Sequence, residues 1–487
     1  MSASSPSRSS TRRRLVGRAL SLCLAVVGLL LLARGVAASN AAVGLGQASR
    51  DPLSVPRWLY VATGGVTIGA SALLASFVTD RRFVLSIHRR QETLPDAETA
   101  YCVAAGALKL LGLVLLALVV YRGLVGPQIP TVNLAVVVVF AGMRAGLTMF
   151  AYLVGNPWPA LNPWRTVAER LPNGFLDYPE RFGRWPAVAG LLALVWVETT
   201  TPVTNDPELL AAAVAAYSVL TVAGALAVGV DDWFRNVDPV SVFFAFYGRA
   251  APVSRADGRL RLRLPGMRLV GDDGYGDESG SESADPTWGM DDVAFAVALV
   301  WELTYSGFVT TAQGGAFVRA LVGVGLPAVV VYGGLFLAGF AAFYGAYVLA
   351  ARVSADRLRT YREARELAVR FAPALLAIAA GYHLAHYLAF FVSLSPSLLA
   401  VLASPLSVPP NPLVLTLPAW VGALNIGFVL GGHLLAIWVA HSTAYRLFPS
   451  RLQAIESQYP FVFVMMAYTA ISLWLISLPT ASPPFLP

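Results

Sequence analysis

Eleven apolar stretches, each close to the length of a membrane-spanning helix, limit what this chain of 487 residues can fold into. A helix that crosses the hydrocarbon core of a bilayer needs about 20 mostly apolar residues. Only 13% of the residues are charged, about half the share in a typical soluble domain. We therefore predict an all-α fold, a polytopic helical bundle with the lipid bilayer as its solvent. The stretches are residues 15–35, 57–79, 101–121, 133–154, 185–201, 208–229, 291–311, 323–350, 369–393, 418–441 and 460–478.

Arginine accumulates in every second connection between these stretches, and this pattern predicts the orientation. Cytoplasmic loops of membrane proteins carry an excess of Lys and Arg. The basic N-terminus falls on the same side as the basic connections, so we predict an N-terminus inside and a C-terminus outside. Because Lys109 is the only lysine, the arginine-rich composition indicates a GC-rich prokaryotic genome and hence a prokaryotic plasma membrane. The basic connections are 80–91, 155–184, 250–270, 351–365 and 445–452.

The chain divides into four parts by composition. Residues 1–14 form a basic N-terminus, and 15–250 form a first membrane section with about six spans. Residues 251–289 form a cytoplasmic loop, and 290–487 form a second membrane section with about five spans and the intramembrane histidines. The first stretch also resembles a signal peptide, with small residues at Val36 and Ala38 before a candidate cleavage site. Its removal would leave ten spans in the same orientation.

Three connections differ from simple spacers. The inner loop 155–184 repeats Asn-Pro-Trp and is rich in Trp and Pro, so we expect an ordered re-entrant or surface loop. Residues 231–252 are predicted to form an amphipathic interfacial segment. In the loop 251–289, alternating Arg and Leu predict a short strand or hairpin, whereas 271–289 are acidic, rich in Gly and Ser, and predicted to be disordered.

Seven charged or histidine side chains lie inside the apolar stretches, away from their ends, where their cost marks them as functional candidates. Counting 1.5 Å per residue from the inner ends places most of them about 20 Å above the inner boundary, in one layer. Glu302 comes out somewhat lower, at about 16 Å. The seven are Lys109, Arg144, Glu198, Glu302, His383, His386 and His433.

The histidines and one carboxylate of this layer predict a metal site. His383 and His386 are three residues apart and share a helix face. With His433 and Glu198 they offer three imidazoles and a carboxylate, ligands that zinc, iron or copper accept. His441 lies eight residues after His433, about 80° away in phase and about 12 Å in height, and so lies outside such a site.

Other interpretations of the same residues remain open. The histidines are also consistent with hydrogen bonds between helices, with a proton relay, or with axial haem ligation. Lys109 or Arg144 would then pair with Glu198 or Glu302. The sequence has no Gly-rich phosphate loop and no nucleic-acid-binding motif, and Cys23 and Cys102 lack a zinc or redox spacing.

Several stretches, taken in order, resemble a family of polytopic prokaryotic membrane proteins often labelled fenitrothion hydrolase-like. Three short motifs match the family's histidine positions: Ala385-His386-Tyr387, Gly432-His433 and Ala440-His441. Glu198 matches the Glu of its fifth span. The chain departs from the family's Phe-Asp-Gly-Phe, because Tyr305-Ser306-Gly307-Phe308 stands there and Glu302 lies one turn earlier. The matching stretches are 51–77, 155–167, 178–198, 231–252, 384–391 and 430–448.

The resemblance implies a membrane hydrolase that acts on an organophosphate triester. In this hypothesis His386, His433 and Glu198, with His383, hold a divalent metal that activates water. Glu198 and Glu302 are candidate catalytic carboxylates, and Arg144 stabilises negative charge. A second hypothesis is a transporter or an ion or proton pathway that uses the same charged residues with a small molecule or ion as its cargo. A third is a non-catalytic metal-binding or assembly factor.

Overall fold

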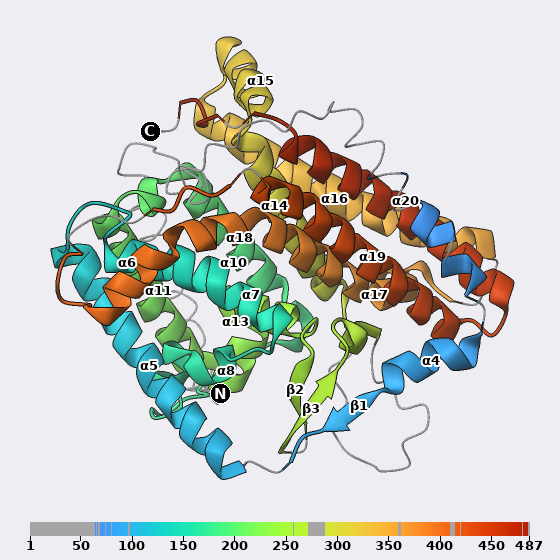
Figure 1. The fold of residues 1–487 in the computed structure, drawn as a ribbon, viewed down its shortest axis with the longest axis horizontal. Coiled ribbons are helices and arrows are strands. Elements are labelled where there is room, and N and C mark those ends of the chain that lie inside the picture. The colour runs from blue at the N-terminus through green and yellow to red at the C-terminus, as the bar shows by residue number, and fades with distance from the viewer. Residues whose placement is uncertain are drawn as a thin grey trace, which may run out of the picture.

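The computed structural model describes residues 64–485 with several gaps. Short gaps lie within 65–79 and at 96–97, 257, 359–361, 410–413, 419 and 480, and a longer one covers 271–287. The apolar stretch 15–35, most of 57–79 and most of the acidic segment 271–289 therefore lie outside the described residues. The described chain is mostly helical, as predicted (Figure 1).

Eight helices of the described part are long and apolar enough to cross a membrane. Each of the predicted stretches from 101–121 onward lies on a helix, although the total of about eleven spans is not confirmed. The fifth stretch forms the shorter α10, Trp185–Thr200. The eight are α5 (Glu98–Val125), α6–η1–α7 (Leu134–Leu153), α11 (Pro207–Val228), α14 (Met290–Val309), α16 (Ala328–Leu358), α17–α18 (Ala364–Phe371 and Pro373–Ala403), α19 (Val421–Leu447) and α20 (Arg451–Ile476).

Four of the basic connections that are predicted to lie inside are joined pairwise at one end of the bundle. A small antiparallel sheet pairs β1 (Gln91–Thr93) with β3 (Arg259–Arg263), and β3 with β2 (Val253–Ala256). It therefore joins the connection 80–91 to the predicted hairpin in 250–270. Arg362 donates a hydrogen bond to the carbonyl of Leu447, which joins two further basic connections at 3.4 Å. The sheet lies beside α4 (Arg81–Arg89), at the lower edge of Figure 1.

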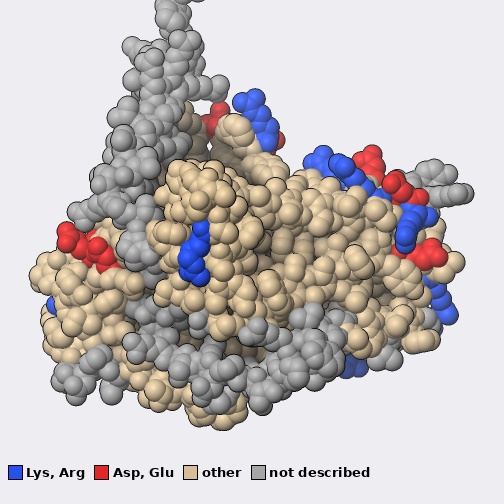
Figure 2. Space-filling model, turned by 90° about the horizontal axis from the view of Figure 1, so that it is seen from above, with Lys and Arg blue, Asp and Glu red and all other residues tan. Residues whose placement is uncertain are grey.

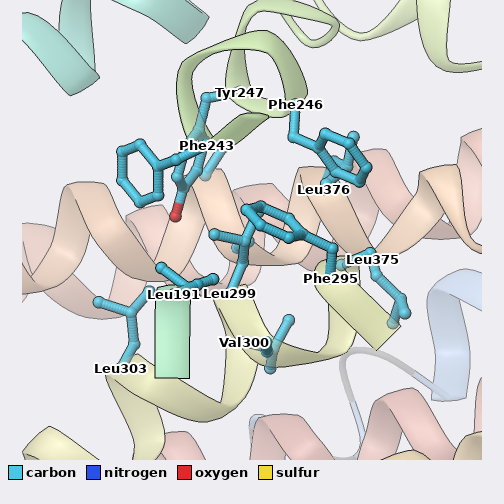
Figure 3. Close-up of a cluster of buried hydrophobic side chains, with 14 of the residues drawn as sticks. Leu191, Phe243, Phe246, Tyr247, Phe295, Leu299, Val300, Leu303, Leu375 and Leu376 are labelled. Atoms are coloured by element: carbon cyan, nitrogen blue, oxygen red, sulfur yellow. The ribbon is translucent and has the colours of Figure 1, made fainter. Parts of the chain in front are cut away.

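The helix α14 forms the centre of the core. All its side chains from Val293 to Val300 are fully buried, and it packs against α10, α16, α18 and α20. Figure 3 shows Phe295 and Leu299 below the aromatic side chains of α13, with Leu375 of α18 beside Phe295. Because this helix is apolar on every side, a charged residue on it faces protein and not lipid.

A close helix crossing joins α18 and α19 through two glycines. A Cβ atom on Gly381 would lie 2.6 Å from the carbonyl oxygen of Phe428, and one on Gly432 would lie 2.7 Å from that of Ala377. Small residues let membrane helices approach this closely. The crossing holds the histidine-bearing parts of the two helices side by side.

The Trp-rich loop is ordered and packs into the bundle, as its repeated Asn-Pro-Trp motif predicts. Its helices α8 (Trp158–Leu161) and α9 (Pro163–Ala168) bury both tryptophans. The indole of Trp158 and the amide of Asn162 both donate to the hydroxyl of Ser241 at 3.0 Å. The loop is thereby fastened to the segment that follows α11.

That segment, 231–252, is more deeply placed than an interfacial helix. Its helix α13 (Pro239–Gly248) buries almost every side chain, with Phe244 at 1% and Tyr247 at 0% exposure. The prediction of an amphipathic interfacial segment is therefore wrong for α13. The physical reason is that its phenylalanines cover all sides of the helix, so no polar face is left for water.

Charged side chains lie mostly toward the edges of the molecule, as a bilayer environment requires. Figure 2 shows a broad face of uncharged residues with Lys, Arg, Asp and Glu gathered mainly near its margins. Large exposed apolar side chains such as Phe77, Val103 and Leu399 lie on helices. Together with the eight long apolar helices, this surface fits a multi-pass membrane protein.

Candidate functional site

The site centres on Arg144, in the middle of an unusual helix. The span Leu134–Leu153 contains an 11-residue π-helix, η1, from Val137 to Leu147. π-Helical segments are rare, usually a single turn, and they occur frequently at functional sites. Arg144 lies near its C-terminal end, on the part that packs against α18.

Two carboxylates share the guanidinium of Arg144. Its Nη2 donates to Oε2 of Glu302 on α14, and its Nε lies 3.5 Å from Oε2 of Glu198 on α10. The side chain of Glu302 is 1% exposed, whereas Arg144 and Glu198 are 14% and 15% exposed. Oε1 of Glu302 is buried and has no hydrogen-bond partner within the described part of the chain. The predicted pairing of Arg144 with these glutamates is therefore confirmed.

Aromatic rings enclose the rest of the guanidinium. Its central carbon lies 5.1 Å from the ring centre of Tyr387 on α18 and 5.6 Å from that of Phe243 on α13. These are distances at which a ring face attracts a cation. The buried hydroxyl of Tyr247, also on α13, has no hydrogen-bond partner among the described residues. Figure 3 shows this hydroxyl pointing from α13 toward the helices below it.

His383 lies directly beside this cluster and is fully buried. Its Nε2 lies 3.0 Å from the backbone carbonyl oxygen of Arg144, and its Nδ1 lies 3.3 Å from the hydroxyl of Tyr152 on α7. The ring of Tyr387 stacks on it with centroids 4.5 Å apart. Both ring nitrogens therefore already have protein partners.

The other histidines are distributed differently. His386, one turn further along α18, is 8% exposed and contacts the ring of Tyr387 edge-on. His433 is fully buried on α19, and its Nδ1 lies 2.7 Å from the carbonyl of Val429 on the same helix. His441 contacts the carbonyl of Val78 through Nε2 at 3.0 Å.

The four predicted metal ligands do not come together as one site. In the described ranges, no three side chains of His, Cys, Asp or Glu lie close enough to hold a metal ion. His383 uses both nitrogens, and His433 bonds to its own helix. Of that predicted set, Glu198 joins the Arg144 cluster, and His383 lies beside it through the Arg144 carbonyl. The metal hypothesis thus gains no support from the geometry.

Lys109 does not take part in the cluster. On α5 it pairs with Glu169 at 2.9 Å, and Arg165 bonds the same carboxylate at 2.8 Å. Glu169 lies just after α9, outside the spans. Partial burial alone would raise the pKa of Glu169, but the hydrogen bonds from Lys109 and Arg165 outweigh it and lower that pKa. This network is an exposed connection between α5 and the Trp-rich loop.

Sequence reasoning missed the aromatic part of the site. Tyr152, Phe243, Tyr247 and Tyr387 are uncharged, so a search for ionisable residues in apolar stretches passes over them. One signal was available, because Tyr387 directly follows His386 in the motif that carries the resemblance. The other three come from two segments whose contact with α18 depends on the tertiary packing.

Comparisons of the chain with protein-family models, with curated proteins and with solved structures found no match.

Proposed function

We propose that this chain is a multi-pass membrane protein that carries protons, alone or coupled to an ion or small molecule, through a proton-binding site made of Arg144, Glu198 and Glu302. The observation that carries the proposal is that two carboxylates share one guanidinium among membrane-spanning helices. Ionisable residues at such depth are costly and usually mark ion pathways or proton relays.

Charge balance supports the proton as cargo. One guanidinium and two ionised carboxylates carry a net charge of −1, which is unfavourable in a low-dielectric interior. One more positive charge neutralises the cluster, and two carboxylates close to one site commonly hold a single proton between them. The unpartnered Oε1 of Glu302 is an oxygen on which that proton would reside.

Differences in exposure support an exchange of this proton. Glu302 is almost completely enclosed, whereas Glu198 and Arg144 keep a partly accessible surface. A proton that enters at Glu198 would pass to Glu302 when Arg144 moves from one carboxylate to the other. The guanidinium is a suitable moving partner, since it carries five N–H donors and stays charged.

Several finer features belong to the same proposal. They are about eleven spans, an N-terminus inside, and a location in the plasma membrane of a prokaryote. The hydrogen bonds that join four of the basic connections at one end support this orientation. The metal-dependent hydrolase has less support, because its predicted ligands lie apart.

Proton flux into liposomes tests the proposal. The purified protein is reconstituted with a pH-sensitive dye inside, and a potassium diffusion potential drives proton entry. We expect wild-type flux above that of empty liposomes and a loss of about 100-fold in Glu302→Gln and Glu198→Gln, the effect of removing a proton-transferring side chain. The matched control is Glu169→Gln, which removes a carboxylate outside the cluster and should keep wild-type flux.

Two results would overturn the proposal. One is wild-type protein without flux under either a potential or a pH gradient, with or without added small ions. The other is full flux in both glutamine variants. Purified protein that contains stoichiometric metal, lost in the His386→Ala/His433→Ala double variant, would instead favour the metal enzyme.

A further inference from the structure

The hydrogen-bond pattern of the Arg144 helix changes immediately after the arginine. The amide of Thr148 donates to the carbonyl of Met143, five residues earlier, which is π-helical spacing, and it also donates to the carbonyl of Ala145. The following helix, α7 (Thr148–Leu153), has α-helical spacing, in which each amide reaches four residues back. When the spacing drops from five to four, one carbonyl of this turn is passed over, and we take it to be that of Arg144, whose oxygen lies 3.0 Å from Nε2 of His383. An unpaired carbonyl is costly inside a membrane protein.

We propose that His383 is a positioning residue, which holds the Arg144 carbonyl at this change of helical pattern and thereby keeps the guanidinium between Glu198 and Glu302. The inference rests on the proposed function for its consequence, although the contact itself does not. Nε2 of His383 lies 3.0 Å from that carbonyl oxygen, which requires a hydrogen on Nε2. Nδ1 is then an acceptor in the neutral ring and receives the hydroxyl hydrogen of Tyr152 at 3.3 Å.

The surroundings hold the ring in this orientation. Tyr387 stacks on it, Tyr152 meets it edge-on at 5.8 Å between centroids, and Tyr247 lies at 5.6 Å. The ring therefore has contacts from α7, α13 and its own helix. The charged and titratable groups nearby are Arg144 with its two glutamates, His386 and these three tyrosines. A second cation beside Arg144 would be unfavourable, which agrees with a neutral imidazole.

This role separates His383 from His433, another fully buried histidine of the α18–α19 pair. His433 bonds a carbonyl of its own helix four residues earlier, so its loss does not remove that kind of hydrogen bond between two helices. His383 instead joins two helices across a long separation in sequence. We call the contact between His383 and the Arg144 carbonyl the clamp. If the clamp is lost, η1 can shorten to α-helical spacing. A shift of one residue turns a helix by about 100° and would swing Arg144 away from the carboxylates.

The test compares three substitutions in purified, reconstituted protein. His383→Phe keeps a flat ring of similar size but has no donor, His383→Gln keeps an N–H donor, and His433→Phe is the matched control. The first readout is proton flux. The second is the pH at which the site takes up its proton, which is monitored through the infrared absorption band of the carboxyl group. The second readout is independent of transport and would not respond to a merely structural role.

The clamp predicts a specific order of results. His383→Phe should lower flux about tenfold and move proton uptake by about one pH unit toward higher pH, since carboxylates without a nearby cation retain protons more strongly. His383→Gln should restore both readouts to within about threefold, or half a pH unit. His433→Phe should leave both unchanged. If His383→Phe does not fold, Tyr152→Phe, which removes only the hydroxyl on Nδ1, should shift both readouts in the same direction.

Failure of the clamp can be told from failure of the proton site. Wild-type flux and uptake in His383→Phe, or a His383→Gln variant as impaired as His383→Phe, overturns the clamp. Wild-type flux in Glu302→Gln and Glu198→Gln overturns the proton site. In that event, a changed pH of proton uptake in His383→Phe, measured by infrared spectroscopy, still supports the clamp if His383→Gln restores the wild-type value.

Discussion

The charge balance at Arg144 makes a quantitative prediction for the substitution Arg144→Gln. This change removes the cation and leaves two carboxylates, one of them 1% exposed. Loss of the charge-assisted bond to Glu302 costs about 1.5–3 kcal/mol. Removing one partner of a buried ion pair costs about 3–5 kcal/mol in total, because the remaining charge stays buried without compensation. We expect the free energy of unfolding to fall by an amount in that range.

Substitution of a carboxylate should cost less than substitution of the arginine. In Glu302→Gln, Arg144 keeps Glu198 as a partner at 3.5 Å, and the cluster becomes neutral. We expect a loss of about 1.5–3 kcal/mol, the size of one hydrogen bond to a charged group. Arg144→Gln leaves negative charge in the cluster without compensation, whereas Glu302→Gln removes one negative charge. The net charge of the cluster therefore predicts that Arg144→Gln lowers the free energy of unfolding more.

The assay is unfolding in mixed micelles, with increasing mole fraction of a denaturing detergent and helicity as the signal. Lys109→Gln serves as control, because it breaks the exposed pair with Glu169 and should cost about 0–1 kcal/mol. The reasoning is refuted if Arg144→Gln is as mild as this control, or if Glu302→Gln is the more destabilising of the two site variants.

Further predictions concern regions outside the cluster. Gly381→Ala should destabilise the protein by about 1–3 kcal/mol in the same unfolding titration, because the new methyl group overpacks the α18–α19 crossing. Gly427→Ala is its control and should leave the stability unchanged, since nothing lies within 4 Å of the new methyl group. The lowered pKa of Glu169 means that its contacts stabilise the fold above the ordinary glutamate range and are lost as the pH falls through the lowered value. Glu169→Gln should therefore flatten the acid side of a plot of Tm against pH, and an equal acid slope in both proteins would contradict this. Arg184 bonds Asp292 at 2.5 Å between the N-terminal ends of α10 and α14, so Asp292→Asn should speed amide hydrogen exchange at the start of α14 and leave that of α5 unchanged.

Sequence patterns alone predicted the helical membrane class and the charged members of the cluster. The reason is that length and hydropathy of each helix are local properties, and that the cost of a charge in an apolar stretch holds whatever the neighbours are. Depth counting from helix ends also brought Arg144, Glu198 and His383 to a similar height, and the structure places Glu198 and His383 each in contact with Arg144.

Local patterns could not predict which partner each residue chose. Lys109 and Arg144 are both basic residues in apolar stretches, but one faces the exposed Glu169 and the other two glutamates of the core. His383 and His433 are both buried, but His383 joins two helices, whereas His433 bonds a backbone carbonyl of its own helix α19. Rotation of each helix about its axis decides these outcomes, and that rotation is set by packing.

The sequence by itself therefore determined the solvent of this protein, the approximate bounds of its helices and the residues that are costly to bury. Only the tertiary structure decided that a π-helical stretch carries Arg144, that Phe243 of α13 lies against its guanidinium, and that His383 contacts its carbonyl. The physical reason is one of range. Hydrophobic partition acts on each segment separately, whereas ion pairs, ring contacts and hydrogen bonds depend on a few ångströms between segments distant in sequence.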